Sequence, residues 1–153
     1  MASSPRWLND EEQALWRLIL GGIRHLERGM EDVLQSESGI GASEFSVLVV
    51  LSEAENRSLR LRDLCQVLEW DRSRASHQIT RMERRGLVVK EKCPEDARGV
   101  FVTLTNDGLA RLEGAAPGHV ESVRRMVFDH LTPEESELLR VFFAKLIDTD
   151  PQG

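Results

Sequence analysis

Residues 71–86 combine short polar and basic side chains in a pattern typical of a surface that contacts a polyanion. Their sequence is DRSRASHQITRMERRG. On an α-helical wheel of about 100° per residue, Ile79 and Met82 fall within about 40° of Ala75 and form a narrow apolar stripe. The opposite side collects hydrogen-bonding and basic groups from Ser73, His77, Thr80 and Arg84, with Arg74 and Arg81 beside them. Hydroxyl and imidazole groups suit base edges and arginines suit phosphates, so these residues predict a helix that lies in a nucleic-acid groove.

The residues around this basic helix predict a helix-turn-helix. A short helix anchored by three leucines is expected over residues 61–68, and residues 69–71 form a tight connection. Asp71 or Ser73 is expected to cap the basic helix, and Gly86 to end it in a left-handed conformation. The alternative is a helical hairpin with a merely solvated basic face. That alternative fits less well, because Glu83 is the one acid inside the basic helix.

A two-stranded wing is predicted directly after the basic helix. Residues 87–92 and 100–104 are β-type runs, and residues 93–99 between them hold the proline, aspartate and glycine of a hairpin tip. Arg98, at this tip, is expected to enter a narrow minor groove, where negative potential is enhanced. Asp96 is expected to orient the Arg98 guanidinium through a charge-assisted hydrogen bond. An ordinary salt-linked turn is the alternative for this pair.

The distribution of charge supports a nucleic-acid partner, although the net charge of the 153 residues is −6. Residues 1–56 hold 4 basic and 10 acidic side chains, residues 57–98 hold 11 and 7, and residues 99–153 hold 5 and 9. A basic segment between two acidic ends is an electrostatic footprint that the net charge conceals. Aromatic residues make up 5% and tyrosine is missing, which argues against a stacking platform for single strands.

Long helices are predicted at both ends of the chain. Asn9 and Glu12 form a capping-box pattern that opens a helix of about 25–28 residues, roughly 40 Å long. Such a helix is too long for one domain of this size to cover, so much of its apolar stripe needs another partner. A loop over residues 36–41 and a second helix over residues 43–54 lead into the helix-turn-helix.

The segment after the wing predicts two further helices. Thr105 is expected to cap the first, whose apolar stripe continues to Leu131, and Pro117 with Gly118 must kink or break it. Thr132, followed by proline and two glutamates, is a strong start for the last helix.

This combination resembles the MarR family of winged helix-turn-helix transcriptional regulators. The residues that carry the resemblance are 64–68, 71–74, 76, 80, 82–88, 96, 98 and 104–108. The segment from the wing to Leu104-Thr-Asn-Asp-Gly108 is the most specific part. Two departures stand out: Ala97 replaces a second arginine that many members carry in the wing, and Arg62 and Cys65 replace smaller residues.

The resemblance implies a mainly α fold with a small β-wing, in a single domain over residues 1–153. Residues 1–40 and 109–150 would form long dimerisation helices, and residues 43–104 the winged helix-turn-helix lobe. The implied assembly is a homodimer of triangular outline. The implied function is sequence-specific binding to double-stranded DNA at a pseudo-palindromic operator, most simply as a repressor.

The candidate DNA-binding residues come from the basic helix and the wing. Ser73, His77 and Thr80 are expected to read base edges, and the arginines to divide between guanines and phosphates. The full set is Arg72, Ser73, Arg74, Ser76, His77, Thr80, Arg81, Arg84, Arg85, Lys92 and Arg98, with Asp96 orienting the wing.

Release by a small aromatic or phenolic effector is a further expectation from the family. Trp16, His25 and Phe45 are the candidates for its pocket, although such residues are more often plain core or surface. Of the two cysteines, Cys65 is expected to be buried in the helix-turn-helix and Cys93 to be exposed near the wing tip. Neither has the spacing of a metal site, and no metal or cofactor is expected.

Two rival function classes remain at this point. A winged-helix protein–protein adaptor without specific DNA binding would have the same fold. A small-molecule enzyme has no supporting set of residues, because no nucleophile elbow, phosphate loop or paired-carboxylate motif is found. The chain has no apolar run of membrane-spanning length and no signal-peptide pattern, so we expect a cytoplasmic protein without a membrane partner.

Overall fold

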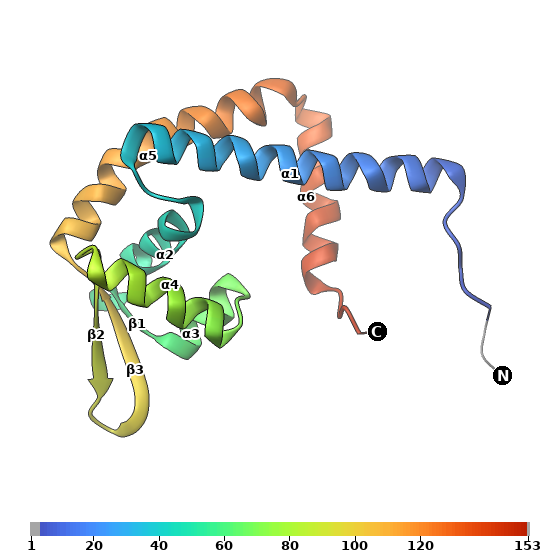
Figure 1. The fold of residues 1–153 in the computed structure, drawn as a ribbon. Helices are drawn as coiled ribbons and strands as arrows, with labels where there is room; N and C mark the ends of the chain where they lie inside the picture. Colours follow the sequence, from blue (N-terminus) through green and yellow to red (C-terminus); the bar gives the residue numbers. More distant parts are fainter. Residues whose placement is uncertain (1–3, 153) are drawn as a thin grey trace.

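The computed structural model describes residues 4–152, which form a small lobe below a long helical arm (Figure 1). The arm contains the first helix, the last two helices and the short 3-10 helix between those two, and the lobe contains the remaining elements. In chain order they are α1 (Asp10–Ser38), α2 (Ala42–Glu53), η1 (Glu55–Arg57), β1 (Ser58–Arg60), α3 (Leu61–Leu68), α4 (Arg72–Arg84), β2 (Val88–Cys93), β3 (Asp96–Leu104), α5 (Asn106–Met126), η2 (Phe128–His130) and α6 (Pro133–Asp148).

The predicted helix-turn-helix is confirmed. Helix α3 has the predicted bounds, and Glu69 closes it in the left-handed region with φ of 54°. The Asp71 carboxylate caps α4 by accepting the backbone N–H of Arg74 at 2.8 Å. Gly86, with φ of 75°, turns the chain from α4 into the wing. These local caps set the angle at which α4 leaves the turn.

The sheet has three strands rather than the two that were predicted, in the order β1-β3-β2 and antiparallel throughout. Strand β1 was missed because three residues are too few to show an alternating pattern. Strand β3 also begins earlier than predicted, at Asp96, because Asp96 pairs with Cys93 across an irregularity after Lys92. The turn at the wing tip therefore shrinks from seven residues to Pro94 and Glu95.

The core of the lobe lies between α2, α3, α4 and the sheet. Ala75, Ile79 and Met82, the predicted apolar stripe of α4, are fully buried there. They pack in one cluster with the core residues of α2, α3, β2 and β3, including Val47, Leu48, Leu51, Leu64, Val88 and Val102. Because this face of α4 is held by the core, its opposite face must point to solvent.

The helices of the arm begin as predicted, but α1 extends further than predicted and α5 ends at Met126, before the predicted Leu131. Asn9 and Glu12 form the capping box of α1, and Thr132 and Glu135 form that of α6. Helix α1 continues into the predicted loop as far as Ser38, where Gly39 caps it in the left-handed region. Helix α5 passes through Pro117 without a break and curves along its length (Figure 1).

The arm leaves large apolar side chains uncovered. Helix α6 buries none of its 16 residues against the part of the chain that the structure describes. Its exposed apolar residues are Leu138, Leu139, Val141, Phe142, Phe143, Leu146 and Ile147, and those at the start of α1 include Leu15, Trp16 and Leu18. Within residues 4–152, no helix has the length and apolar character that a membrane span requires.

Candidate nucleic-acid interface

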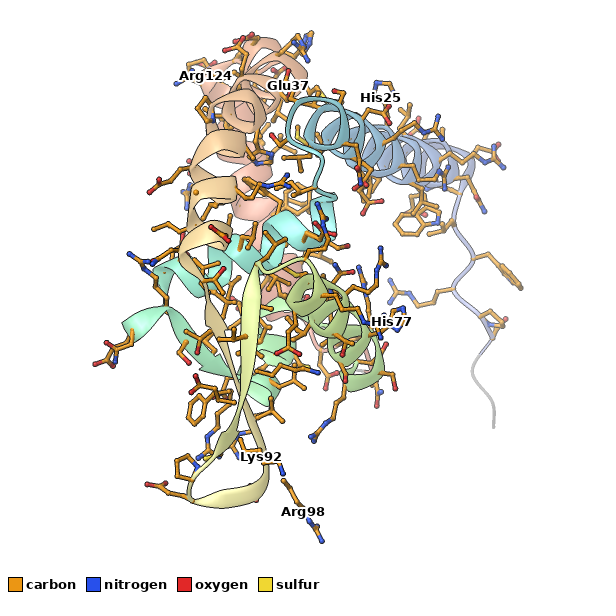
Figure 2. The ribbon with its side chains drawn as sticks, turned by 60° about the vertical axis from the view of Figure 1, so that its left-hand side comes forward. His25, Glu37, His77, Lys92, Arg98 and Arg124 are labelled. Carbon is orange, nitrogen blue, oxygen red and sulfur yellow. The ribbon has the colours of Figure 1, made fainter. Side chains whose placement is uncertain are left out.

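The exposed face of α4 carries the polar residues that were predicted to read bases. Arg72, Ser73, Ser76, His77 and Thr80 line one open hollow on this face. All five are exposed except Thr80, which is half-buried, and Figure 2 shows His77 pointing outward from α4. Arg81 and Arg84 are also exposed, in the last turns of α4 before the wing. The arrangement offers short donors and acceptors in the middle and guanidinium groups at the sides, as a DNA groove requires.

Arg74 is placed apart from this hollow. Its guanidinium carbon lies 4.3 Å from the centre of the Trp70 ring, a cation–π contact. Arg74 and Trp70 both line a cleft beneath α1. This cleft is separate from the hollow that Ser73 and His77 line. The Arg74 side chain is therefore held against the turn between α3 and α4.

Arg85 has a structural role that differs from the predicted contact with DNA. Its guanidinium forms an ion pair with the buried Glu44 carboxylate of α2. It also donates to the backbone carbonyl of Gly39, at the end of α1, at 2.8 Å. A buried carboxylate without a partner is costly, so Arg85 is held where it neutralises Glu44. We therefore leave Arg85 out of the candidate interface.

The wing presents Lys92 and Arg98 to solvent, and Figure 2 shows the Arg98 side chain reaching beyond the hairpin. Asp96 acts differently from the prediction. Its carboxylate accepts a hydrogen bond from the backbone N–H of Arg98 at 3.0 Å. Asp96 therefore stabilises the turn and does not orient the Arg98 guanidinium. An aspartate commonly bonds the N–H two residues on in this way. Between residues 4 and 152, the Arg98 guanidinium forms no ion pair.

A second basic hollow, of about 140 Å³, lies between the wing and the starts of α3 and α4. Its lining includes Arg60, Arg62, Arg72 and Arg98. The first two were not among the predicted DNA-binding residues. The density of arginines over residues 57–62 was a signal that could have pointed to them.

Cys93 is buried, which corrects the expectation of an exposed thiol near the wing tip. Its Sγ atom accepts a hydrogen bond from Arg60 at 3.4 Å, and the Arg60 guanidinium also lies 5.5 Å from the centre of the Phe101 ring. Cys65 is half-buried, and desolvation raises the pKa of its thiol. Among the described residues, no group of three or more His, Cys, Asp or Glu side chains is placed to hold a metal ion.

Helix α4 is tied to the wing by a small polar network. The Glu83 carboxylate accepts the backbone N–H of Lys90 on β2 at 2.7 Å. The Lys90 ammonium lies 3.7 Å from the other Glu83 oxygen and donates to the Thr80 hydroxyl at 3.2 Å. The one acid of the basic helix thus serves to attach the wing.

The cleft beneath α1 has a volume of about 360 Å³ and joins α1, α2, α4 and α5. Its walls include Leu26, Met30, Phe45, Trp70, Arg74 and His119. The predicted pocket residue Phe45 is among them, whereas Trp16 and His25 are not. Trp16 is 48% exposed near the start of α1, and His25 is exposed and points away from the lobe (Figure 2). Both lie on the uncovered part of α1, because the cleft begins only at Leu26.

His119 is one of several residues of this cleft that were not predicted to line a pocket. Its ring centre lies 4.4 Å from that of Phe45, and burial lowers the pKa of the imidazole. Its Nδ1 atom is buried and has no hydrogen-bond partner among the described residues. No periodic signal joins His119 to Phe45 or Trp70, since they come from three separate segments of the chain.

A helix with a buried apolar stripe and an exposed basic face, followed by a basic hairpin, defines the winged helix-turn-helix class of DNA-binding proteins. Comparison with known proteins narrows this class. The MarR family profile matches residues 38–99. The uncharacterized HTH-type transcriptional regulator YkoM of Bacillus subtilis is 30% identical over 142 residues, which cover 90% of this chain and 89% of that protein.

Solved structures agree with the sequence relatives. Sco3205, a MarR family regulator from Streptomyces coelicolor crystallised with DNA, superposes with a TM-score of 0.92 at 39% identity and covers 95% of this chain and 91% of its own. AbsC, from the same organism, gives 0.88 at 41% identity over 94% and 97% of the two chains. The chain belongs to the MarR family, whose members are transcriptional regulators and not enzymes.

Proposed function

We propose that this protein is a homodimeric repressor that binds a pseudo-palindromic site in double-stranded DNA. The observation that carries the proposal is the exposed hollow of Arg72, Ser73, Ser76, His77 and Thr80 on α4, beside a wing that extends Arg98. Two relatives of known structure support it, since Sco3205 and a cysteine-to-serine mutant of Escherichia coli MarR were both crystallised with DNA. The second is 26% identical, with a TM-score of 0.79.

Within the proposed interface, each group has a distinct role. Ser73, His77 and Thr80 read base edges in the major groove. Ser76 and the exposed arginines Arg72, Arg81 and Arg84 contact phosphates or guanines, and Lys92 and Arg98 follow the backbone into the minor groove. Arg60 and Arg62 extend this basic surface between helix and wing.

The arm is the proposed dimer interface. Residues 1–40 and 109–150 act as dimerisation helices around the DNA-binding lobe of residues 43–104. Support comes from the uncovered apolar side chains of α1 and α6, which one copy of the chain does not bury. A two-fold dimer would place the two copies of α4 about one helical turn of DNA apart, near 10 bp between half-site centres.

The cleft beneath α1 is the proposed site for a small aromatic or phenolic effector. Phe45, Trp70 and Met30 offer apolar contacts, and the Arg74 guanidinium offers a charge for an anionic group. Because Arg74 belongs to α4, which is the proposed recognition helix, a ligand that contacts Arg74 would contact that helix directly. Such a ligand releases DNA only if it binds the DNA-bound and free conformations with different affinity.

The experiment that tests this function is a selection of random duplex DNA by the purified protein at about 150 mM salt. We expect an inverted repeat with half-sites about 10 bp apart. A His77→Ala, Ser73→Ala variant is the control, and it should retain low-salt binding while losing the repeat. Binding without any enriched sequence would favour the alternative, a winged-helix adaptor that contacts other proteins. The proposed setting is the cytoplasm.

A further inference from the structure

Among the described residues, the hydroxyl of Thr80 is the one predicted base-reading group that has a charged hydrogen-bond partner. Lys90, on the first strand of the wing, donates to Thr80 Oγ1 at 3.2 Å. Lys90 is itself held on two sides by Glu83, through its backbone N–H at 2.7 Å and its ammonium at 3.7 Å. Thr80 and Glu83 are one turn apart on α4, so the strand and helix hold the hydroxyl between them.

This contact determines what the hydroxyl can offer to DNA. A lysine ammonium has three donors and no acceptor, so Thr80 Oγ1 must accept. Among the described residues the Thr80 hydroxyl donates to no other group, and its proton is therefore free. A second lone pair remains on the oxygen. A base amino group that approached it would bring its positive hydrogen close to the Lys90 ammonium, which is unfavourable.

We propose that Lys90 is a specificity-determining residue: by donating to Thr80, it makes the Thr80 hydroxyl a donor toward an acceptor atom on a base edge. The acceptors in the major groove are N7 and O6 of guanine, N7 of adenine and O4 of thymine, and the disfavoured groups are the amino groups of cytosine and adenine. The inference rests on the proposed function, because it requires α4 to lie in the major groove.

The main competing role for Lys90 is a direct contact with a phosphate. The two roles differ in a measurable way, since a phosphate contact lowers affinity for all sequences and reduces the salt dependence by about one charge. Lys92 is the matched control, because it is an exposed lysine on the same strand, and among the described residues the side-chain partner of Thr80 is Lys90 and not Lys92.

The experiment is the duplex selection repeated with four variants: Thr80→Val, Thr80→Ser, Lys90→Met and Lys92→Met. Valine keeps the shape of threonine without the hydroxyl, and serine keeps the hydroxyl. We expect Thr80→Val to lose the preference at one position of each half-site and Thr80→Ser to keep it. Lys90→Met should broaden that same position and weaken binding to the wild-type site about three- to tenfold, with little effect on random DNA.

Lys92→Met should weaken binding to selected and random DNA equally and leave every position of the motif unchanged. Circular dichroism with thermal unfolding establishes that each variant is folded. The inference is overturned if Lys90→Met behaves like Lys92→Met, or if Thr80→Val retains every preference of the wild type. If the wild-type protein selects no motif, the proposed function itself fails. If it selects a motif and the variants do not change it as expected, only the role of Lys90 fails.

Discussion

The DNA-binding lobe and the helical arm of this protein contain similar apolar residues but differ in how far they bury them. In the lobe, Leu48, Leu64, Ile79 and Met82 are fully buried by their neighbours. In the arm, Phe142 and Leu146 on α6 are about half exposed, and Ile147 is 80% exposed. The lobe thus completes its core within one chain, whereas the arm leaves these side chains uncovered by the described residues. Replacing residues in one region and then in the other tests this difference.

The largest effect is expected from a double variant in the arm, Phe142→Glu with Leu146→Glu. Two charges on the exposed apolar face of α6 should prevent a second copy from covering it. Light scattering should then report a monomer, and affinity for the operator should fall about a hundredfold or more because the two half-sites are no longer bound together. Phe142→Leu with Leu146→Met is the control. A double variant that remains dimeric would contradict the proposed interface.

The matching change in the lobe is Ile79→Ala. Removing this fully buried side chain should lower the free energy of unfolding by about 2–4 kcal/mol, since it leaves a cavity beneath the recognition helix. Denaturant unfolding measures the loss. Exposed Val67 on α3 is the control, and Val67→Ala should change stability by about 0.5 kcal/mol or less.

Adjacent arginines at the end of α4 sharpen the comparison. Arg85→Ala should destabilise the fold by about 1–3 kcal/mol, a range that allows for the partial exposure of Arg85, because the buried Glu44 carboxylate loses its partner. Arg84→Ala should leave stability unchanged and weaken DNA binding. Unfolding curves and DNA titrations on both variants separate the two roles; equal effects on stability would refute the assignment.

A smaller effect is expected at the wing. Arg98→Ala should weaken operator binding roughly tenfold without changing the selected sequence, because a minor-groove contact responds to groove shape more than to base identity. A shifted consensus in the duplex selection would show instead that Arg98 reads a base.

The smallest effect is expected from His119, which lies at the boundary between the lobe and the arm. It should make the free energy of unfolding depend on pH. Burial lowers the pKa of His119 below its ordinary value of 6.5, so the unfolded chain binds the proton more readily than the folded one. The contribution of His119 is therefore fully present above about pH 6.5 and is lost as the pH falls below that value. His119→Phe should remove this part of the pH dependence, measured as the difference between the two unfolding curves.

Local signals in the sequence predicted most of the lobe. The period of the apolar residues identified α4, and the caps at Asp71, Gly86, Thr105 and Thr132 placed the ends of elements within a residue or two. Strand β1 gave no such signal, because its stability comes from pairing with β3 about 40 positions along the chain rather than from its own three residues.

The assignment of individual side chains was less complete. Four arginines in and after α4, Arg72, Arg74, Arg84 and Arg85, look alike in sequence. In the structure Arg72 and Arg84 face solvent, whereas Arg74 stacks on Trp70 and Arg85 pairs with Glu44. Of the three predicted pocket residues, Phe45 alone lines the cleft. The residues that the structure places elsewhere than predicted share one cause, since nothing in the local sequence reports a partner on another element.

By itself the sequence determined which face of α4 is buried, because helical periodicity leaves one side apolar and the other polar. It also determined the order of helix, turn, helix and wing, because caps and turns depend on neighbouring residues. Tertiary structure alone decided that Arg85 neutralises Glu44, 41 positions away, and that Lys90 holds the Thr80 hydroxyl. Hydrogen bonds and ion pairs depend on distances of about 3 Å, which only the folded chain brings about.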